Sequence, residues 1–482
     1  MRTCAKEGIV QPNTQLADYI LFAEEEGRPS SLLAAKEPAS YNEAKAEKGW
    51  CDTMEEEMRS IIDNRTWELC ALPPGHRTIG LKWVYKLKKD AQGVMVHHMD
   101  VKSAFLNSDL LKEVYVQQSP GYVKAGEEDK VLRLRKALYG LRQAPRAWNG
   151  KLDDRHRKLT AARWGVDDLI ITGMNMEVIA SFKQQMTKLF RMSDLGKLSF
   201  YLGIEIHQEC DRTTLYQTAY AKCLLERAGQ ADCNSLSTPI QPRLKLSKED
   251  IGDAVDITYY RTIIGGLGYL THTRPDISFA VGYLSRFMEA PAAIHNVMVK
   301  NLLCYIAGTL EYGCTFKRGK GEPKLTGFSD ADHDGGIVDR KSMTGTIFFL
   351  GENPISWQSQ KQRVVAISSC EAKYVAATTA ACQGIWLAWL LGEMLNDETV
   401  PPKLFVHNKS AISLSKNPVF HERSKHVDIR YHFIRECVDE GKIDIDYVRT
   451  NDQLADTLTK GLRRLAFQEL RRRIGMTEIL RK

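Results

Sequence analysis

The chain lacks the features that mark membrane-spanning or disulfide-stabilised secreted proteins. It has no run of about 18 apolar residues, the length that crosses a bilayer. Its N-terminus has no apolar core of a secretory signal, and its eleven cysteines include no C-x-x-C pair. These absences predict an intracellular protein, cytoplasmic or nuclear, with reduced thiols and no membrane partner.

A large excess of one charge is also missing. The net charge of +7 is a weak preference for polyanions and does not by itself establish a nucleic-acid partner. Charged residues make up 26% of the chain and hydrophobic residues 43%, which is typical of a folded globular protein. A length of 482 residues leaves room for about three domains.

Two adjacent acids, Asp167 and Asp168, precede the apolar run 169–172, a pattern that predicts acids at the turn of a hairpin. Adjacent carboxylates repel, so solvent or a divalent cation must screen them. An Asp-Asp pair alone is more often a solvated turn, but Asp100 ends a second strand-like run. Three such carboxylates could hold two Mg²⁺ ions, the arrangement used for nucleotidyl transfer.

The first half of the chain alternates helical and strand-like patterns. The apolar positions of 41–62 recur at helical spacing. In 79–88, apolar residues alternate with lysines, as in a strand whose basic face is either solvated or binds phosphates. In 136–148, cations and aromatic residues interleave, which suits either base stacking or an ordinary helix and turn.

The second half predicts helices at 236–316, a Gly- and Pro-containing linker at 317–323, and then strands alternating with helices. The most pronounced helix is Ala-rich and covers about 369–395. This order predicts a mixed sheet with flanking helices. The last twenty residues carry many arginines, which favours a solvated helix over a nucleic-acid or lipid contact.

Several longer motifs occur in a recognisable order. They are His98–Asn107, Leu138–Trp148, Val166–Asp168, Thr273–Asp276, Ile355–Gln362 and Arg423–His432. With these motifs the chain resembles the reverse transcriptase and ribonuclease H part of Ty1/copia-type retrotransposon polyproteins, from about residue 41 to residue 475.

The resemblance implies an α+β and α/β fold with an incomplete polymerase palm and fingers domain, a helical connection and a ribonuclease H-like mixed-sheet domain. The expected divisions are a flexible N-terminal arm (1–40), a reverse transcriptase-like domain with two internal deletions (41–235), the connection (236–322), the ribonuclease H-like domain (323–460) and a basic C-terminal helix (461–482).

For the polymerase, the resemblance implies that Asp100, Asp167 and Asp168 bind Mg²⁺ or Mn²⁺ and carry catalysis. A primer 3′-hydroxyl would attack the α-phosphate of a nucleotide, with the metals stabilising the attacking and leaving oxygens. Phe105 would crowd the 2′ position of the sugar, and Gln143 belongs to the nucleotide-binding motif. The implied partners are an RNA template and an RNA–DNA hybrid.

For the ribonuclease H, the resemblance implies four acids around two metals. Asp330 matches the first and Asp456 the last, so both are expected to bind metal and to be catalytic. The middle positions differ, because Lys373 stands where the family has Glu and His407 where it has Asp. Glu371 cannot substitute, since residues two apart on a helix point to different faces. These differences predict that hydrolysis is lost.

The polymerase part departs from the family by missing blocks between Val94 and His97 and between Thr160 and Gly165. The second block contains the strand that should pair with the Asp167–Asp168 hairpin, so these acids are expected to lie no longer opposite Asp100. The blocks are missing either through erosion of a mobile element or through gaps in the gene prediction.

The sequence therefore predicts a retrotransposon-derived RNA-directed DNA polymerase and ribonuclease H polypeptide, impaired in both activities. The alternatives are a non-catalytic nucleic-acid-binding remnant and a non-functional pseudogene product.

Overall fold

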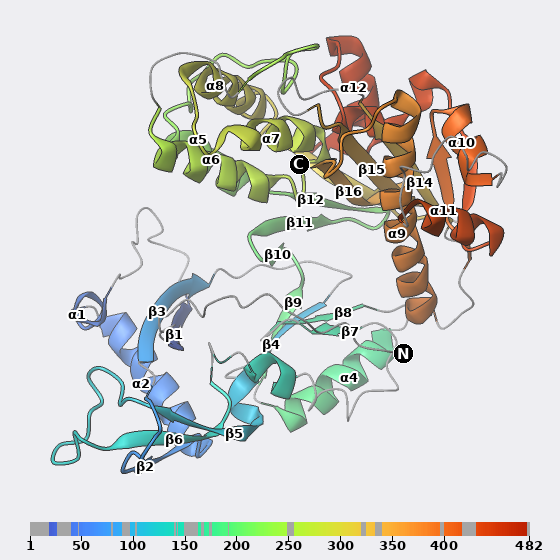
Figure 1. Ribbon diagram of the computed structural model, residues 1–482. Helices are drawn as coiled ribbons and strands as arrows, with labels where there is room; N and C mark the ends of the chain where they lie inside the picture. Colours follow the sequence, from blue (N-terminus) through green and yellow to red (C-terminus); the bar gives the residue numbers. More distant parts are fainter. Residues whose placement is uncertain are drawn as a thin grey trace. The chain divides into compact units, whose positions relative to one another are not determined.

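Contacts within the chain define two compact units, Met1–Leu198 and Ser199–Lys482, each described here by itself (Figure 1). The computed structural model describes residues 19–26, 40–46, 48–78, 81–88, 97–101, 104–138, 141, 143–148, 162–164, 168–172, 176–190, 192–247, 255–319, 324–332, 340–395, 400–416 and 430–479. Most of the motif at 423–432 and the junction of the first missing block lie outside these residues; of the second junction, 162–164 are described.

The first unit begins with helices α1 (Tyr41–Ala44) and α2 (Lys48–Asp63). The predicted apolar stripe of α2 is confirmed at its buried positions, which are Trp50, Met54, Met58 and Ile61. Beside these helices lies a three-stranded sheet in the order β2 (Trp67–Cys70), β6 (Val131–Lys136), β5 (Asp109–Val116).

A second sheet of this unit has the order β7 (Ala162–Trp164), β8 (Asp168–Ile171), β4 (His97–Val101), β9 (Met192–Lys197), and all its pairs are antiparallel. Helix α4 (Met176–Leu189) contributes Met186 to the core that also contains Met99 and Leu169. The prediction that β8 has lost its partner is wrong, because the three residues of β7 pair with it.

Strand β3 (Leu81–Lys88) confirms the strand predicted at 79–88 and pairs in parallel with β1 (Tyr19–Glu26). Strand β1 lies inside the segment predicted as an N-terminal arm; the rest of 1–39 lies outside the described residues.

The second unit begins with a five-stranded sheet in the order β10 (Phe200–Tyr201), β11 (Ile204–Gln208), β12 (Arg212–Tyr216), β13 (Tyr312–Lys317), β19 (Met476–Glu478). The single strand predicted at 198–206 is a hairpin instead. Its turn residues Leu202 and Gly203 both have positive φ, 47° and 76°, as a two-residue hairpin turn requires.

The helical prediction for 236–316 is wrong at its end, where β13 begins at Tyr312. Helices α6 (Ile257–Leu270), α7 (Ser278–Leu284) and α8 (Ala293–Ala307) lie within the predicted region, and α5 (Thr218–Arg227) precedes it. Their shared core also contains Met343 and Phe467, which come from much later in the chain. The helical region and the sheet that follows it are therefore packed into one body.

The third sheet has the order β16 (Asn353–Lys361), β15 (Met343–Leu350), β14 (Leu325–Ala331), β17 (Lys403–Val406), β18 (Asp444–Tyr447). Strands β14, β15 and β16 are antiparallel neighbours, and β17 and β18 join in parallel. Helices α9 (Ser369–Leu395), α10 (Lys409–Lys416) and α11 (Arg430–Asp439) contribute to its core. This arrangement confirms the predicted mixed sheet with helices.

Helix α9 confirms the long Ala-rich helix predicted at about 369–395. By length and composition it is apolar enough to cross a membrane, although half of its most apolar 18-residue window is buried in the structure. Ala377, Ala380 and Ala381 pack in the same core as Phe348 of β15 and Leu404 of β17. In this structure α9 is the central helix against the third sheet.

The Thr-Arg-Pro-Asp motif forms a buried ion pair. The Arg274 guanidinium donates to both Asp276 oxygens, at 2.9 and 2.8 Å, and to the carbonyl and hydroxyl of Thr309. The Tyr305 hydroxyl donates to Asp276 at 2.6 Å, and Arg471 of α12 (Arg464–Arg473) donates to Tyr305. The C-terminal helix, predicted to be solvated, is therefore docked on this network by Arg471.

Candidate functional site

The predicted polymerase acids lie in the sheet of the first unit. Asp100 is in β4 and Asp168 begins β8, and the strand register places their Cα atoms directly opposite each other. Asp167 lies outside the described residues. The expectation that the deletion separates Asp168 from Asp100 is therefore wrong for the backbone.

The two predicted nucleotide-binding residues, Phe105 and Gln143, belong to the same unit as this sheet. Phe105, in the 3₁₀ helix Ala104–Asn107, is 3% exposed and packs in the hydrophobic core of the unit. Gln143 is half-buried, and its carbonyl accepts a hydrogen bond from the Ala147 amide at 3.0 Å, in the helical turn 144–148. Their roles towards a nucleotide stay predictions.

The four positions expected to form the ribonuclease H site come together in the second unit. Asp330 is near the end of β14, Lys373 is in the first turns of α9, His407 follows β17, and Asp456 is in the 3₁₀ helix Leu454–Leu458. Because β14 and β17 are parallel neighbours with Ser329 opposite Val406, the next residues, Asp330 and His407, lie at the same edge of the sheet.

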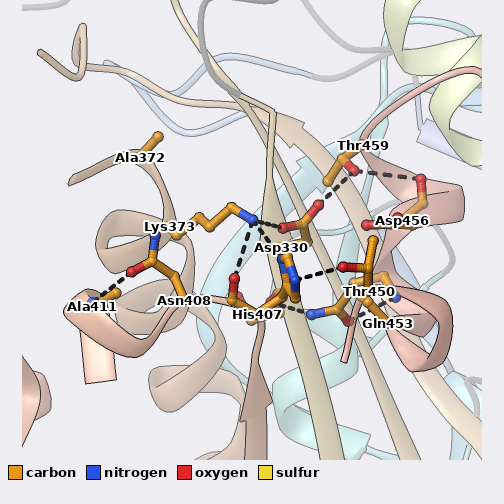
Figure 2. Close-up of polar contacts among 12 residues, drawn as sticks. Asp330, Ala372, Lys373, His407, Asn408, Ala411, Thr450, Gln453, Asp456 and Thr459 are labelled. Atoms are coloured by element: carbon orange, nitrogen blue, oxygen red, sulfur yellow. Dashed lines mark hydrogen bonds and ion pairs between the residues drawn. The ribbon is translucent and has the colours of Figure 1, made fainter. Parts of the chain in front are cut away.

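The Lys373 ammonium lies between Asp330 and His407, as Figure 2 shows. Its Nζ is 2.9 Å from Asp330 Oδ1, 3.3 Å from His407 Nδ1 and 3.5 Å from the His407 carbonyl. The Asp330 side chain is 1% exposed and that of Lys373 16% exposed. The substitution therefore places a buried positive charge against the first acid.

A second ammonium, which sequence reasoning missed, completes the cluster. Lys460 Nζ is 2.9 Å from Asp456 Oδ1 and 3.6 Å from Asp330 Oδ2, and the Thr459 hydroxyl donates to Asp330 Oδ2 at 3.1 Å. The spacing of four residues between Asp456 and Lys460 is the signal that could have found this pair. Asp330 thus lies between two cations.

The electrostatics of the cluster follow from burial and these charges. Burial disfavours the ionised form of Asp330, but Lys460 and Lys373 outweigh it and hold the pKa of Asp330 below its ordinary value. Burial, followed by the negative charge of Asp330, raises the pKa of Asp456 to about 7. Burial and the charge of Lys373 lower the pKa of His407, which is therefore neutral near pH 7.

The hydrogen bonds of His407 fix its tautomer. An ammonium group can only donate, so His407 Nδ1 accepts from Lys373. The ring proton is therefore assigned to Nε2, which donates to the Thr450 hydroxyl at 2.8 Å. Both ring nitrogens already have partners, which leaves neither for a metal ion.

These residues do not fit the two-metal centre that the family implies. A divalent cation such as Mg²⁺ prefers oxygen ligands at about 2.0–2.1 Å, whereas an ammonium fills the space between Asp330 and His407. Within the part of the chain that the structure describes, no three His, Cys, Asp or Glu side chains are grouped to hold a metal ion.

Glu371 does not replace the missing acid. Its carboxylate accepts a hydrogen bond from the Ile367 amide at 2.9 Å, and its own amide donates to the Ser368 hydroxyl at 3.1 Å. Glu371 therefore caps the start of α9.

Comparisons with known proteins identify the family of the chain. The family described as "Reverse transcriptase (RNA-dependent DNA polymerase)" matches residues 91–164 and 158–242. The Pol polyprotein from transposon RE1 of Arabidopsis thaliana is 34% identical over 99% of this chain and 36% of the relative. A transposon Ty5-1 protein of Saccharomyces cerevisiae is 34% identical over 58% of this chain and 98% of its own length.

Among solved structures, a foamy viral protease-reverse transcriptase in complex with double-stranded DNA aligns with a TM-score of 0.49 and 11% identity. The alignment covers 82% of this chain and 69% of the viral chain.

The fold and the relatives define a retrotransposon-type polypeptide with a polymerase part and a ribonuclease H-like part. The chain belongs to the family of copia-type retrotransposon Pol polyproteins. It spans a little over a third of the length of the plant Pol polyproteins that it matches.

Proposed function

We propose that the chain is an RNA-directed DNA polymerase and ribonuclease H polypeptide of retrotransposon origin in which hydrolysis has been lost and DNA synthesis is impaired. The observation that carries this proposal is the Lys373 ammonium 2.9 Å from Asp330. Two-metal hydrolysis needs cations held by carboxylates at this place, to generate the nucleophile and to stabilise the leaving oxygen.

An ammonium group supplies one positive charge, half that of a divalent metal ion, and nothing else of the metal's chemistry. It has no coordination position for water and does not generate a bound hydroxide, as a metal does. The Lys373 ammonium also has partners of its own, since it pairs with Asp330 and donates to His407. The proposed site therefore neutralises its acids without activating a nucleophile.

The test is cleavage of a labelled RNA·DNA hybrid by the full chain with Mg²⁺ or Mn²⁺. We expect no cleavage above that of the Asp330→Asn variant. The double variant Lys373→Glu, His407→Asp restores the expected acid set and is expected to cleave, with Asp330→Asn in that background as its control. Asp330-dependent cleavage by the unchanged chain would contradict the proposal.

The impairment of DNA synthesis is supported by the missing blocks. The alignment with the RE1 polyprotein extends over 546 positions, more than the 482 residues of this chain. The polymerase family matches in two segments, 91–164 and 158–242, which overlap at 158–164, where the second block is missing. The retained register of Asp100 and Asp168 is the observation that opposes it.

Primer extension on an RNA template, with Mg²⁺ or Mn²⁺, measures this balance. We expect synthesis at the level of the matched Asp100→Asn variant, because template and nucleotide contacts of the missing blocks are lost. Synthesis that disappears in Asp100→Asn would show that the remaining palm is sufficient, and the polymerase part of the proposal would fail.

A non-catalytic nucleic-acid-binding remnant is the second candidate, favoured by the net positive charge of the chain, +7. It predicts binding of an RNA·DNA hybrid that weakens as salt is raised and that is unchanged in Asp100→Asn. Fluorescence anisotropy at several salt concentrations separates it from a product without any nucleic-acid affinity.

A further inference from the structure

We infer that Lys373 and Lys460 are built-in counter-ions that make the ribonuclease H-like domain independent of divalent metal. The inference deepens the proposed function, since it concerns the same residues. It makes a separate claim, however, because it states what stabilises the folded domain and not which reaction the domain performs.

The first argument is the balance of charge inside the cluster. Asp330 and Asp456 are 1% and 10% exposed in their side chains, so their negative charges are poorly screened by water. Lys373 and Lys460 each lie 2.9 Å from one of these acids. The two ammonium groups balance the two acids when both are ionised and exceed them when Asp456 is protonated, so no excess negative charge remains for a metal ion to neutralise.

The second argument is the position of these charges in the fold. Asp330 is on the central strand β14, Lys373 on α9, and Asp456 and Lys460 in and after the 3₁₀ helix Leu454–Leu458. The Gln453 side-chain amide also donates to the Ser329 carbonyl, at 3.0 Å. The ion pairs therefore connect a strand, a helix and the segment 453–460, which a metal centre would otherwise cross-link.

The third argument comes from the geometry around Lys373. Its ammonium has a carboxylate acceptor on Asp330 at 2.9 Å and the imidazole and carbonyl of His407 at 3.3 and 3.5 Å (Figure 2). A metal ion could enter only by displacing this group from an acid that is 1% exposed. A buried charge that loses its partner is strongly unfavourable, so displacement is opposed.

The test measures thermal unfolding of the full chain in EDTA and at increasing MgCl₂, with ionic strength held constant by NaCl. All proteins carry Asp100→Asn, so that the palm acids contribute less to metal binding. We expect the Tm of the chain with Lys373 and His407 intact to be the same in EDTA and in Mg²⁺. In the Lys373→Glu, His407→Asp background the cluster gains acids, and Tm is expected to rise with Mg²⁺ concentration.

Hydrogen exchange of residues 325–331 and 369–380 locates the effect in the domain, even if the two units unfold separately. Mn²⁺ binding, followed by its electron paramagnetic resonance signal, gives a second measurement that does not depend on unfolding. A Mg²⁺-dependent rise in Tm, or Mn²⁺ binding lost on Asp330→Asn, in the protein that keeps Lys373 would overturn the inference.

The failures of the two proposals are distinguishable. Hybrid cleavage by the unchanged chain overturns the proposed function. Metal-dependent protection of residues 325–331 without any cleavage overturns only the role of Lys373 and Lys460 as counter-ions.

Discussion

The palm sheet (β7, β8, β4, β9) and the ribonuclease H-like sheet (β16, β15, β14, β17, β18) depart from the family in different ways. The first lacks blocks of sequence, and the second carries substitutions. In the palm, Asp100 and Asp168 keep their register although family blocks are missing on either side. In the ribonuclease H-like domain the described residues form a five-stranded sheet with its helices, but two of the four positions at which the resemblance implies acids hold Lys373 and His407.

The difference separates the effect of a deletion on the backbone from the effect of a substitution on the local charge. A short replacement strand, β7, pairs with β8 and supports the backbone of Asp168. In the other domain the strands around Asp330 are paired, but the Lys373 ammonium 2.9 Å from Asp330 changes the sign of the local charge. Backbone register is kept across a deletion in the first case, whereas in the second the backbone is kept and the charge beside the acid is reversed.

The largest loss of stability is expected from replacing Asp330 in the ribonuclease H-like sheet, and a smaller one from replacing Asp100 in the palm sheet. Asp330→Asn leaves Lys373 without its carboxylate and removes one of the two acids near Lys460, so we expect a loss of about 3–5 kcal/mol in the free energy of unfolding. Urea unfolding, followed by hydrogen exchange of 325–331, measures it. Asp100→Asn in the palm is the matched comparison. If it destabilised residues 325–331 as much as Asp330→Asn does, the contrast between the two sheets would be contradicted.

A smaller effect is expected from the cation itself. Lys373→Met keeps the length of the side chain and removes its charge, while Lys460 stays near Asp330. We expect a loss of about 1.5–3 kcal/mol, the range for hydrogen bonds to charged groups. The measurement is again urea unfolding.

Lys403→Met is the control for that variant, because Lys403 forms an ion pair of the same length, 2.9 Å, with Asp446 on the same sheet. These side chains are 44% and 54% exposed, so the expected loss is at most about 1 kcal/mol. A similar loss in both variants would show that burial does not distinguish the two pairs.

Local patterns predicted the elements that have their own periodicity. The stripe of α2 and the long apolar helix α9 were readable because their cores repeat at helical spacing. The family motifs also identified Lys373 and His407 as altered positions, since the chain differs from each motif at one residue.

The remaining features depend on contacts between distant segments, which leave little local signal. Strand β7 has three residues, and β19 pairs with β13 from more than 150 residues away. Lys460 meets Asp330 only because the segment after β18 returns to β14. A sequence shows the charges of such a cluster but not that folding brings them together.

The smallest effect is a pH dependence from Asp456. Its folded pKa of about 7 lies above the ordinary 3.8, because burial and Asp330 disfavour its charge. Between pH 4 and 7 the folded chain therefore holds more of this proton than the unfolded chain, and stability from this group falls as pH rises, by at most about 1.4 kcal/mol per pH unit. Asp330, whose pKa is lowered, acts with the opposite sign, and its contribution is lost as pH falls through its folded pKa.

The Asp456→Asn variant isolates this dependence. We expect the parent chain to lose stability relative to Asp456→Asn as pH rises from 5 to 7, measured by urea unfolding at each pH. Asn keeps the size of the side chain and removes its titration, and Lys460 still faces Asp330. A parent chain that gains on the variant over this range would mean that Lys460 keeps Asp456 ionised in the folded state, which makes the cluster a fully charged quartet with even less affinity for metal.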